Sequence, residues 1–234
     1  MKTTIQTEDG SCPAYWFGPD GAPGVLVFMD GVGIRPAMLE VGERLGAAGF
    51  RALLPDLYYR AGPYAPMNAK TVFSDPKERD ALRARFMSTT NLANVMRDTK
   101  AFLAHLPGKV AVTGYCMGGR FALAAAGTYP DRVVAAAAFH PGNPAGDAPD
   151  SPHLLAPKMK ARVYVGGASD DASFPDVQMQ RLEQALADAR VDHLVERIPA
   201  KHGWVLTDTP AYDAAQAERH WQTLLDLLGR ALKA

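Results

Sequence analysis

The sequence has little cysteine and no excess of charge of either sign. Its 234 residues include two cysteines, Cys12 and Cys116, and 25 basic residues balance 25 acidic ones. Without a secretory signal, free thiols are favoured over a disulfide. A chain with no net charge also lacks the basic surface that phosphate backbones and anionic lipids attract. We therefore expect no nucleic-acid partner and no membrane partner.

Long hydrophobic runs are missing as well. No run reaches the roughly 18 apolar residues that a membrane-spanning helix needs. The N-terminal stretch "MKTTIQTEDG" has no apolar segment of the kind found in signal peptides, so we expect a cytoplasmic protein. The sequence has no internal repeat, low-complexity tract or linker-like change of composition. We expect a single domain over residues 1–234 that acts as a monomer.

Six short apolar runs alternate with segments of helical periodicity. Most of the runs are apolar throughout, which is typical of strands that helices cover on both faces. The alternation predicts an α/β fold built on a mostly parallel sheet. The expected strands cover residues 24–29, 51–55, 109–114, 132–139, 161–167 and 193–198. The expected helices cover residues 36–49, 76–87, 91–106 and 120–129, a segment after Pro175 and the C-terminal segment.

One cysteine lies where an expected strand becomes an expected helix. In "KVAVTGYCMGGR", residues 109–120, Gly114 and Gly118 flank Cys116 at the spacing Gly-x-Cys-x-Gly. This is the pattern of a nucleophile elbow, a tight turn that lifts a reactive side chain above the edge of the sheet. Glycines are needed there because side chains would collide with the neighbouring strand and helix. The pattern predicts a nucleophilic Cys116, and the alternative, a small buried hydrophobic residue, stays open.

A nucleophilic thiol needs a base and an acid, and candidates for both follow later in the sequence. With such an elbow, the acid and then the histidine come at the ends of later strands. "ASDDASFP" offers Asp170 and Asp171 after one expected strand, and "PAKHGW" offers His202 after the last. His140, which also follows an expected strand, is the competing histidine. Position and chain order favour His202 as the base.

These residues resemble the dienelactone hydrolase family of α/β-hydrolases. The similarity includes "GYCMGG", "SDDASFP", "KHGW" and "PDLYYRAG", and it runs from "GVLVFMDGVG" to the final helix. It implies an α/β-hydrolase fold and hydrolysis of carboxylic esters or lactones. It carries the catalytic roles over to Cys116, Asp171 and His202. Asp171 is preferred to Asp170 because a short segment ending in proline follows it, as in the family.

The resemblance also assigns residues around the thiol. It implies a carboxylate close to the resting thiol at Asp30 and an oxyanion-binding amide at Gly31, to which the turn before the helix adds the amide of Met117. Because a nearby negative charge disfavours a thiolate, we expect Asp30 to keep the resting thiol protonated. The sequence departs from the family after His202, where no arginine occurs before Arg219. A dienelactone therefore need not be the natural substrate.

Aromatic residues are frequent near these motifs and in the long interval 57–75, which we expect to form a lid or a binding wall. Each of them could equally fill the core. The candidate substrate-binding residues are Tyr58, Tyr59, Tyr64, Phe73, Tyr115 and Trp204.

Two other functions stay open at this point. The chain could be a non-catalytic binding member of the fold, or a thiol redox protein that uses Cys116. The sequence contains no metal-ligand cluster, phosphate-binding loop or dinucleotide fingerprint. We therefore expect neither a cofactor nor a metal, and a small ester or lactone as the substrate.

Overall fold

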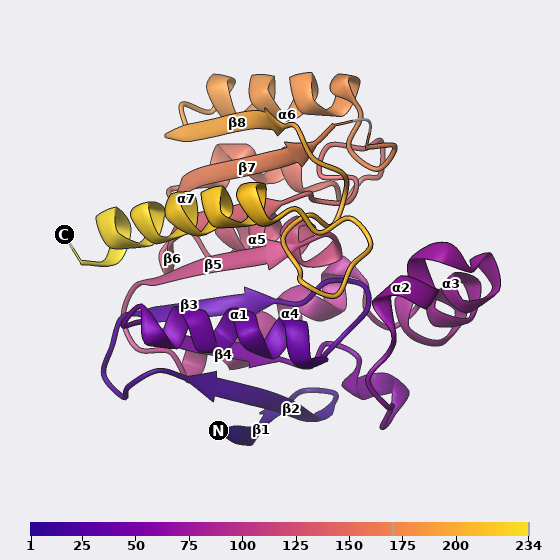
Figure 1. Ribbon diagram of the computed structural model, residues 1–234. Helices are drawn as coiled ribbons and strands as arrows, with labels where there is room; N and C mark the ends of the chain where they lie inside the picture. The colour runs from indigo at the N-terminus through magenta and orange to yellow at the C-terminus, as the bar shows by residue number, and fades with distance from the viewer. Residues whose placement is uncertain (170, 234) are drawn as a thin grey trace.

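An eight-stranded sheet runs through the centre of the molecule (Figure 1). The structure is a computed structural model that describes residues 1–169 and 171–233. The strands lie in the order β1-β2-β4-β3-β5-β6-β7-β8. The pairs β1–β2 and β2–β4 are antiparallel, and β3 to β8 all run parallel. The bounds are β1 Lys2–Thr7, β2 Gly10–Phe17, β3 Gly24–Phe28, β4 Arg51–Pro55, β5 Val110–Tyr115, β6 Val133–Phe139, β7 Arg162–Ala168 and β8 His193–Ile198.

The six predicted strands correspond to β3 to β8, and the predicted α/β fold with a mostly parallel sheet is confirmed. Helices cover both faces of this sheet. In Figure 1, α1 and α7 lie on one face, and α4 and α5 lie on the other. α6 packs on β8 and on a 3-10 helix that contacts α5. The bounds are α1 Pro36–Ala47, α4 Leu92–Ala104, α5 Met117–Thr128, the 3-10 helix Pro152–Lys158, α6 Asp176–Asp188 and α7 Ala214–Leu232.

The central strands are apolar throughout because helices cover them on both sides. Every residue of β3 and β5 is buried, and β6 contains a run of four alanines. Small side chains let helices approach a sheet closely, and both α5 and α7 contact β6. This close packing places the first turn of α5 directly above the carboxyl ends of β3 and β5.

The N-terminal hairpin of β1 and β2 is the part of the sheet that the sequence analysis missed. In β1 a single residue, Ile5, is buried, and its neighbours are half-buried or exposed. A short edge strand with one face toward water carries too few apolar residues to stand out by composition. The hairpin extends the sheet beyond β4, and the start of β2 lies beside the carboxyl end of β4.

The interval 57–75, expected to be a lid or wall, is partly helical. It and the residues after it form the 3-10 turn Tyr59–Ala61, α2 Ala69–Ser74, α3 Pro76–Leu82 and the π-helical turn Arg83–Met87. The side chain of Asn68 caps α2 and that of Asp75 caps α3. Figure 1 shows α2 and α3 beyond the carboxyl ends of the parallel strands. Among the described residues, no helix is both long enough and apolar enough to cross a bilayer.

Candidate active site

Cys116 lies between β5 and α5 in a backbone conformation that side chains rarely adopt. Its φ is 54° and its ψ is −116°, the strained turn that the Gly-x-Cys-x-Gly pattern predicts. Close contacts explain the glycines. A Cβ on Gly114 would lie 2.1 Å from the carbonyl oxygen of Gly118, and a Cβ on Gly118 would lie 2.2 Å from that of Phe28. Substitution at either position would displace the turn that presents the thiol.

Backbone hydrogen bonds hold this turn in place from two directions. The N–H of Cys116 donates to the carbonyl of Phe139 at 3.0 Å, and its own carbonyl accepts from Gly119 and Gly142, each at 3.1 Å. The turn is thereby tied to the end of β6, to the loop that follows β6 and to the first turn of α5. A strained residue persists only where its surroundings hold it in this way.

The side chains of Asp171 and His202 meet beyond the ends of β7 and β8. Nδ1 of His202 lies 2.6 Å from Oδ2 of Asp171. The other oxygen of Asp171 accepts from the backbone N–H of Ser173 at 2.9 Å and from its hydroxyl at 2.6 Å. Burial opposes ionisation of Asp171, but the hydrogen bonds from His202 and Ser173 outweigh burial and hold the pKa of this carboxyl below its usual value. Asp171 is therefore an anion that orients the imidazole through Nδ1.

His202 also interacts with the side chain of Cys116. Burial disfavours the charged form of the imidazole, but the negative charge of a Cys116 thiolate and hydrogen bonds with Asp171 and Cys116 outweigh burial. Together they raise the pKa of His202 to about 10. The imidazole and the carboxylate therefore pair beyond the ends of β7 and β8, and Cys116 influences the pKa of that imidazole. The expected protonation of the resting thiol stays a prediction.

His140, the competing histidine, packs against His202. The two ring centroids lie 4.7 Å apart, and the ring of Trp204 lies 5.0 Å from that of His140. His140 is fully buried, and burial holds its pKa well below the usual value. Neither of its ring nitrogens has a hydrogen-bond partner in the part of the chain that the structure describes. Asp170, the alternative acid, lies outside the described residues.

The two predicted oxyanion amides come from separate elements that touch one another. Met117 is the first residue of α5, so its N–H is one of the amides that a helix leaves without an intrahelical partner. Gly31 follows β3, and its carbonyl accepts a hydrogen bond of 2.7 Å from the hydroxyl of Tyr58. Gly118 packs against the carbonyls of Phe28 and Met29 at the end of β3. The loop after β3 therefore lies against the start of α5.

Asp30 has a partner that the sequence analysis did not consider. It is 3% exposed, and its two oxygens accept from Arg35 at 2.7 and 3.0 Å. One of them also accepts from the N–H of Val32 at 3.0 Å. Both oxygens are thus engaged away from the thiol contact that the family resemblance implies. An effect of Asp30 on the thiol stays a prediction.

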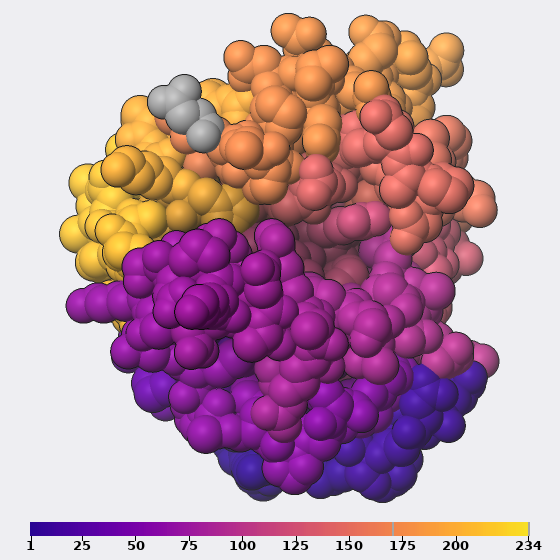
Figure 2. All heavy atoms as spheres, turned by 90° about the vertical axis from the view of Figure 1, so that its right-hand side faces the viewer, coloured from indigo at the N-terminus to yellow at the C-terminus, as the bar shows by residue number. Residues whose placement is uncertain are grey.

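A cavity of about 600 Å³ opens beside His202. Phe73 of α2 lines one side of it, and the opposite side is formed by residues that follow β8, among them Pro199, Lys201 and Pro210. Figure 2 shows this face of the molecule, with a hollow above the purple segment that contains α2 and α3 and below the orange segment that follows β7. The lining is largely apolar, and Lys201 contributes a positive charge to it.

Phe73 is the predicted substrate-binding residue that lines this cavity. Tyr58 and Tyr115 are completely buried, and Trp204 is 1% exposed. The hydroxyl of Tyr115 lies 3.0 Å from Nε2 of His220. Tyrosine and tryptophan can fill the core when their polar atoms find partners or aromatic neighbours. These three residues therefore support the site from the core and do not line this cavity.

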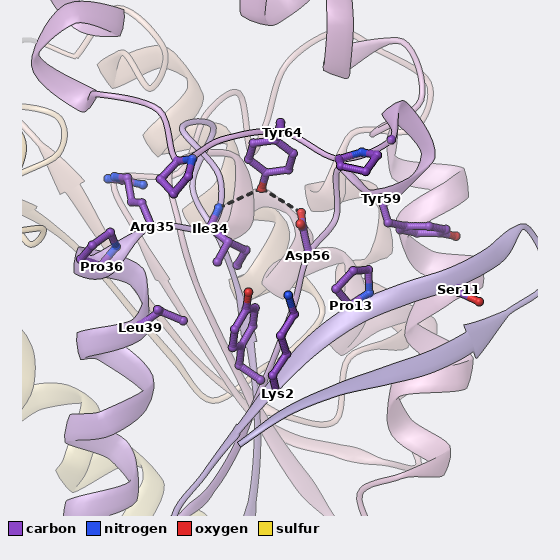
Figure 3. A pocket seen from close by; sticks show the side chains of 14 residues that line it. Lys2, Ser11, Pro13, Ile34, Arg35, Pro36, Leu39, Asp56, Tyr59 and Tyr64 are labelled. Carbon is purple, nitrogen blue, oxygen red and sulfur yellow. Dashed lines mark hydrogen bonds between the residues drawn. The ribbon is translucent and has the colours of Figure 1, made fainter.

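Tyr59 and Tyr64 line a second cavity, of about 620 Å³, between the β1–β2 hairpin and the loop after β4 (Figure 3). The hydroxyl of Tyr64 accepts from the N–H of Ile34 at 3.0 Å and donates to Asp56 at 2.9 Å, the two bonds drawn in Figure 3. Tyr64 therefore holds the loop after β3 from the side away from His202. Neither tyrosine lines the cavity beside His202.

Three residues near the site were not predicted, namely Ser173, Arg35 and Lys201. Ser173 had a local signal, because a serine two residues after an aspartate commonly closes a turn on its carboxylate. Arg35 had none, because one of its two partners is 173 positions away in the sequence. Within the described residues, no three His, Cys, Asp or Glu side chains gather as a metal site requires.

The chain is similar to known proteins of one family. The model of the dienelactone hydrolase family matches residues 12–232. A protein of Methylorubrum extorquens, provisionally named carboxymethylenebutenolidase, is 30% identical over 243 residues, which cover 96% of this chain and 79% of that protein. Carboxymethylenebutenolidase 1 of Cupriavidus pinatubonensis is 37% identical over 109 residues, 44% of either chain. A solved structure provisionally named a dienelactone hydrolase, from Klebsiella pneumoniae, shares the fold with a TM-score of 0.84 at 24% identity, covering 98% of this chain and 97% of that one.

Proposed function

Because the chain belongs to the dienelactone hydrolase family, whose members hydrolyse lactones or esters, we propose that it uses Cys116, His202 and Asp171 as a catalytic triad. The intermediate is a thioacyl-enzyme on Cys116. One observation carries the proposal. Asp171 binds Nδ1 of His202 at 2.6 Å, and Cys116 at the strained turn contributes to the raised pKa of the same imidazole. A nucleophile, a base and a group that orients the base are the parts that acyl transfer requires.

In the first half-reaction, Sγ of Cys116 attacks the carbonyl carbon of the ester or lactone. His202 holds the thiol proton and delivers it to the leaving oxygen as the C–O bond breaks. Asp171 keeps the imidazole in one tautomer and stabilises its positive charge. The products are a thioester on Cys116 and an alcohol, or, from a lactone, a thioester whose far end carries the released hydroxyl.

The tetrahedral intermediate carries a negative oxygen, which the amides of Gly31 and Met117 are suited to bind. Met117 begins α5, so the positive end of the helix dipole points toward this oxygen. Each such donor is typically worth roughly 3 kcal/mol of transition-state stabilisation. Water then attacks the thioester with His202 as the base, and the carboxylic acid leaves as Cys116 is regenerated.

The cavity beside His202 indicates the kind of acyl substrate. A volume of about 600 Å³ fits a small molecule. Phe73 and the prolines favour an apolar or flat group, and the charge of Lys201 favours a polar or anionic end near the entrance. We therefore expect small carboxylic esters or lactones to be the substrate class.

The test compares three forms of the protein on p-nitrophenyl acetate and on a panel of lactones that includes a dienelactone. Wild type should turn over at least one member of the panel. Cys116→Ala should lose that activity by about a thousandfold or more, and Cys12→Ala, the matched control for loss of a thiol, should keep it. Mass spectrometry of the quenched reaction should find one acyl group on the peptide that contains Cys116.

Two outcomes would contradict the proposal. Hydrolysis that survives in Cys116→Ala would place the chemistry elsewhere. A wild-type protein without hydrolytic activity on the whole panel, whose thiol is nevertheless oxidised reversibly by peroxide, would favour the redox alternative.

A further inference from the structure

Arg35 is a buried cation that joins two carboxylates. It is 2% exposed, and its guanidinium binds Asp30 through NH1 and NH2 at 2.7 and 3.0 Å. It binds Asp208 through Nε and NH2 at 2.6 and 3.0 Å, and NH1 also donates to the carbonyl of Gly33 at 3.1 Å. A guanidinium has five N–H donors, so these contacts use all of them.

The two carboxylates belong to loops on different sides of Cys116. Asp30 immediately precedes Gly31, the amide proposed to bind the oxyanion. Asp208 lies in the loop between β8 and α7, six positions after His202. Arg35 therefore links the loop of the oxyanion amide to the loop of the base. A second link between the same regions is exposed, from the hydroxyl of Thr207 to Glu40 on α1 at 3.0 Å.

Stability of the fold alone does not account for this arrangement. Burying a guanidinium and a carboxylate costs desolvation energy, and apolar side chains of similar volume stabilise a core equally well or better. The particular contribution of a bidentate guanidinium–carboxylate pair is a fixed relative orientation of the two groups. Arg35 makes two such pairs at once, so it fixes the orientation of both loops.

The loop after β3 is also held from its other side. The hydroxyl of Tyr64 accepts from the N–H of Ile34, and the hydroxyl of Tyr58 donates to the carbonyl of Gly31. In Figure 3 the hydroxyl of Tyr64 and its bond to Ile34 face the second cavity, whereas the guanidinium of Arg35 points away from that cavity. The tyrosines fix this loop relative to the sheet, and Arg35 connects it to the loop of His202.

We infer that Arg35 is a positioning residue, which fixes the spacing between the amide of Gly31 and the imidazole of His202. The inference rests on the proposed function. Its donors are all bound to protein groups, so Arg35 acts on the reaction through the loops and not through contact with substrate. A displacement of about 1 Å between reacting groups can lower a rate about a hundredfold.

Two substitutions of different severity test this inference. Arg35→Lys keeps the charge but loses the planar fork. Asp208→Asn removes one carboxylate whose side chain is 35% exposed, so it is the milder change. The control is Arg44→Gln. Arg44 lies on α1, which begins directly after Arg35, and its substitution breaks an exposed ion pair with Glu218 of α7. For each variant we would measure kcat and KM on p-nitrophenyl acetate, the melting temperature, and the rate of Cys116 alkylation by iodoacetamide against pH.

We expect Arg35→Lys to lower kcat about a hundredfold and Asp208→Asn about tenfold, with KM within about twofold of wild type. The pH profile of alkylation should shift in both variants, because that reaction depends on the imidazole beside the sulfur and needs no oxyanion amide. Arg44→Gln should leave all three measurements as in wild type.

The inference is overturned if Asp208→Asn and Arg35→Lys lower only the melting temperature, while kcat and the alkylation profile match wild type. If Arg35→Lys does not fold, Asp208→Asn alone decides the matter by the same criterion. Failure of the proposed function would look different, because wild-type hydrolysis would then be independent of Cys116. The alkylation profile would still report whether Arg35 controls the position of His202.

Discussion

The two cysteines have the same side chain in opposite surroundings. Cys12, on β2, is 0% exposed, and its thiol donates to the carbonyls of Pro13 and Asp56, each at 3.4 Å. Burial and the nearby charge of Asp56 raise the pKa of this thiol. Cys116 is partly exposed at a strained turn, and its side chain contributes to the raised pKa of His202. The difference teaches that the reactivity of a thiol depends on its place in the fold and on its partners.

The sheet also keeps the two thiols apart. β4 and β3 lie between β2 and β5, so three strand spacings, about 14 Å, separate their strands. A disulfide needs Cα atoms within about 7 Å, and both cysteines are free. Cys12 is therefore unsuited to act as the resolving thiol that the redox alternative would want.

The largest expected effect comes from removing the carboxylate that orients His202 beside Cys116. Asp171→Asn should lower kcat about ten-thousandfold, because the amide no longer holds the imidazole in the required tautomer. Ser173→Ala is the comparison variant, since it removes the Ser173 hydroxyl from Asp171 and His202 but leaves the bond between those two residues. It should lower kcat about tenfold or less. Both values follow from initial rates on a p-nitrophenyl ester. A similar loss in the two variants would show that the carboxylate does not act through His202.

Alkylation should separate the two cysteines by about a thousandfold or more in rate. Cys116 reacts directly, whereas Cys12 reacts only when β2 opens, and such openings of a buried strand are rare. Peptide mapping by mass spectrometry after iodoacetamide treatment measures both rates in one sample. In guanidinium chloride the two cysteines should label equally. Equal labelling of Cys12 and Cys116 in the native protein would contradict the expected difference in their reactivity.

A smaller effect is expected when Cys12 is replaced. Cys12→Ala should lower the free energy of unfolding by about 1–2 kcal/mol, because it removes a buried sulfur from the packing of β2. Urea denaturation measures this change, and ester hydrolysis should match wild type. Loss of activity at unchanged stability would mean that Cys12 takes part in the chemistry.

A further effect concerns the dependence of stability on pH. The pKa of His202 in the folded protein, about 10, lies above its ordinary value of about 6.5. Its pairing therefore stabilises the folded state fully below pH 6.5, and this contribution is lost as the pH rises through 10. The free energy of unfolding should fall more between pH 7 and pH 10 in wild type than in His202→Gln. In Cys12→Ala the free energy of unfolding should fall with pH as in wild type. An equal fall in wild type, Cys12→Ala and His202→Gln would contradict the raised pKa of His202.

The fold was predictable where the sequence carries a strong local pattern. The strands β3 to β8 are short apolar runs, and the glycines around Cys116 mark the turn from β5 into α5. The hairpin of β1 and β2 was missed because its outer strand buries only Ile5. An edge strand gains its place by pairing with a neighbour, and that pairing leaves little trace in its own composition.

The candidate site was predictable in its chemistry and less so in its surroundings. Cys116, Asp171 and His202 were predicted from the turn pattern, from the ends of later strands and from the family resemblance; the structure pairs Asp171 with His202, and the role of Cys116 as nucleophile stays a proposal. Of the aromatic candidates, Phe73 lines the cavity beside His202, whereas Tyr115 is buried in the core. An aromatic residue near a motif can face either way, because core and cavity accept the same side chain.

Local sequence was sufficient to predict the buried strands and the strained turn at Cys116, because each of these is set by residues close together along the chain. The arrangement of Asp30, Arg35 and Asp208 was decided only when distant segments packed together. Arg35 and Asp208 are 173 positions apart, and no local pattern selects one buried carboxylate for one arginine over such a separation. Long-range ion pairing is a property of the packed fold, since it exists only after the loops that carry its members have been brought to the same edge of the sheet.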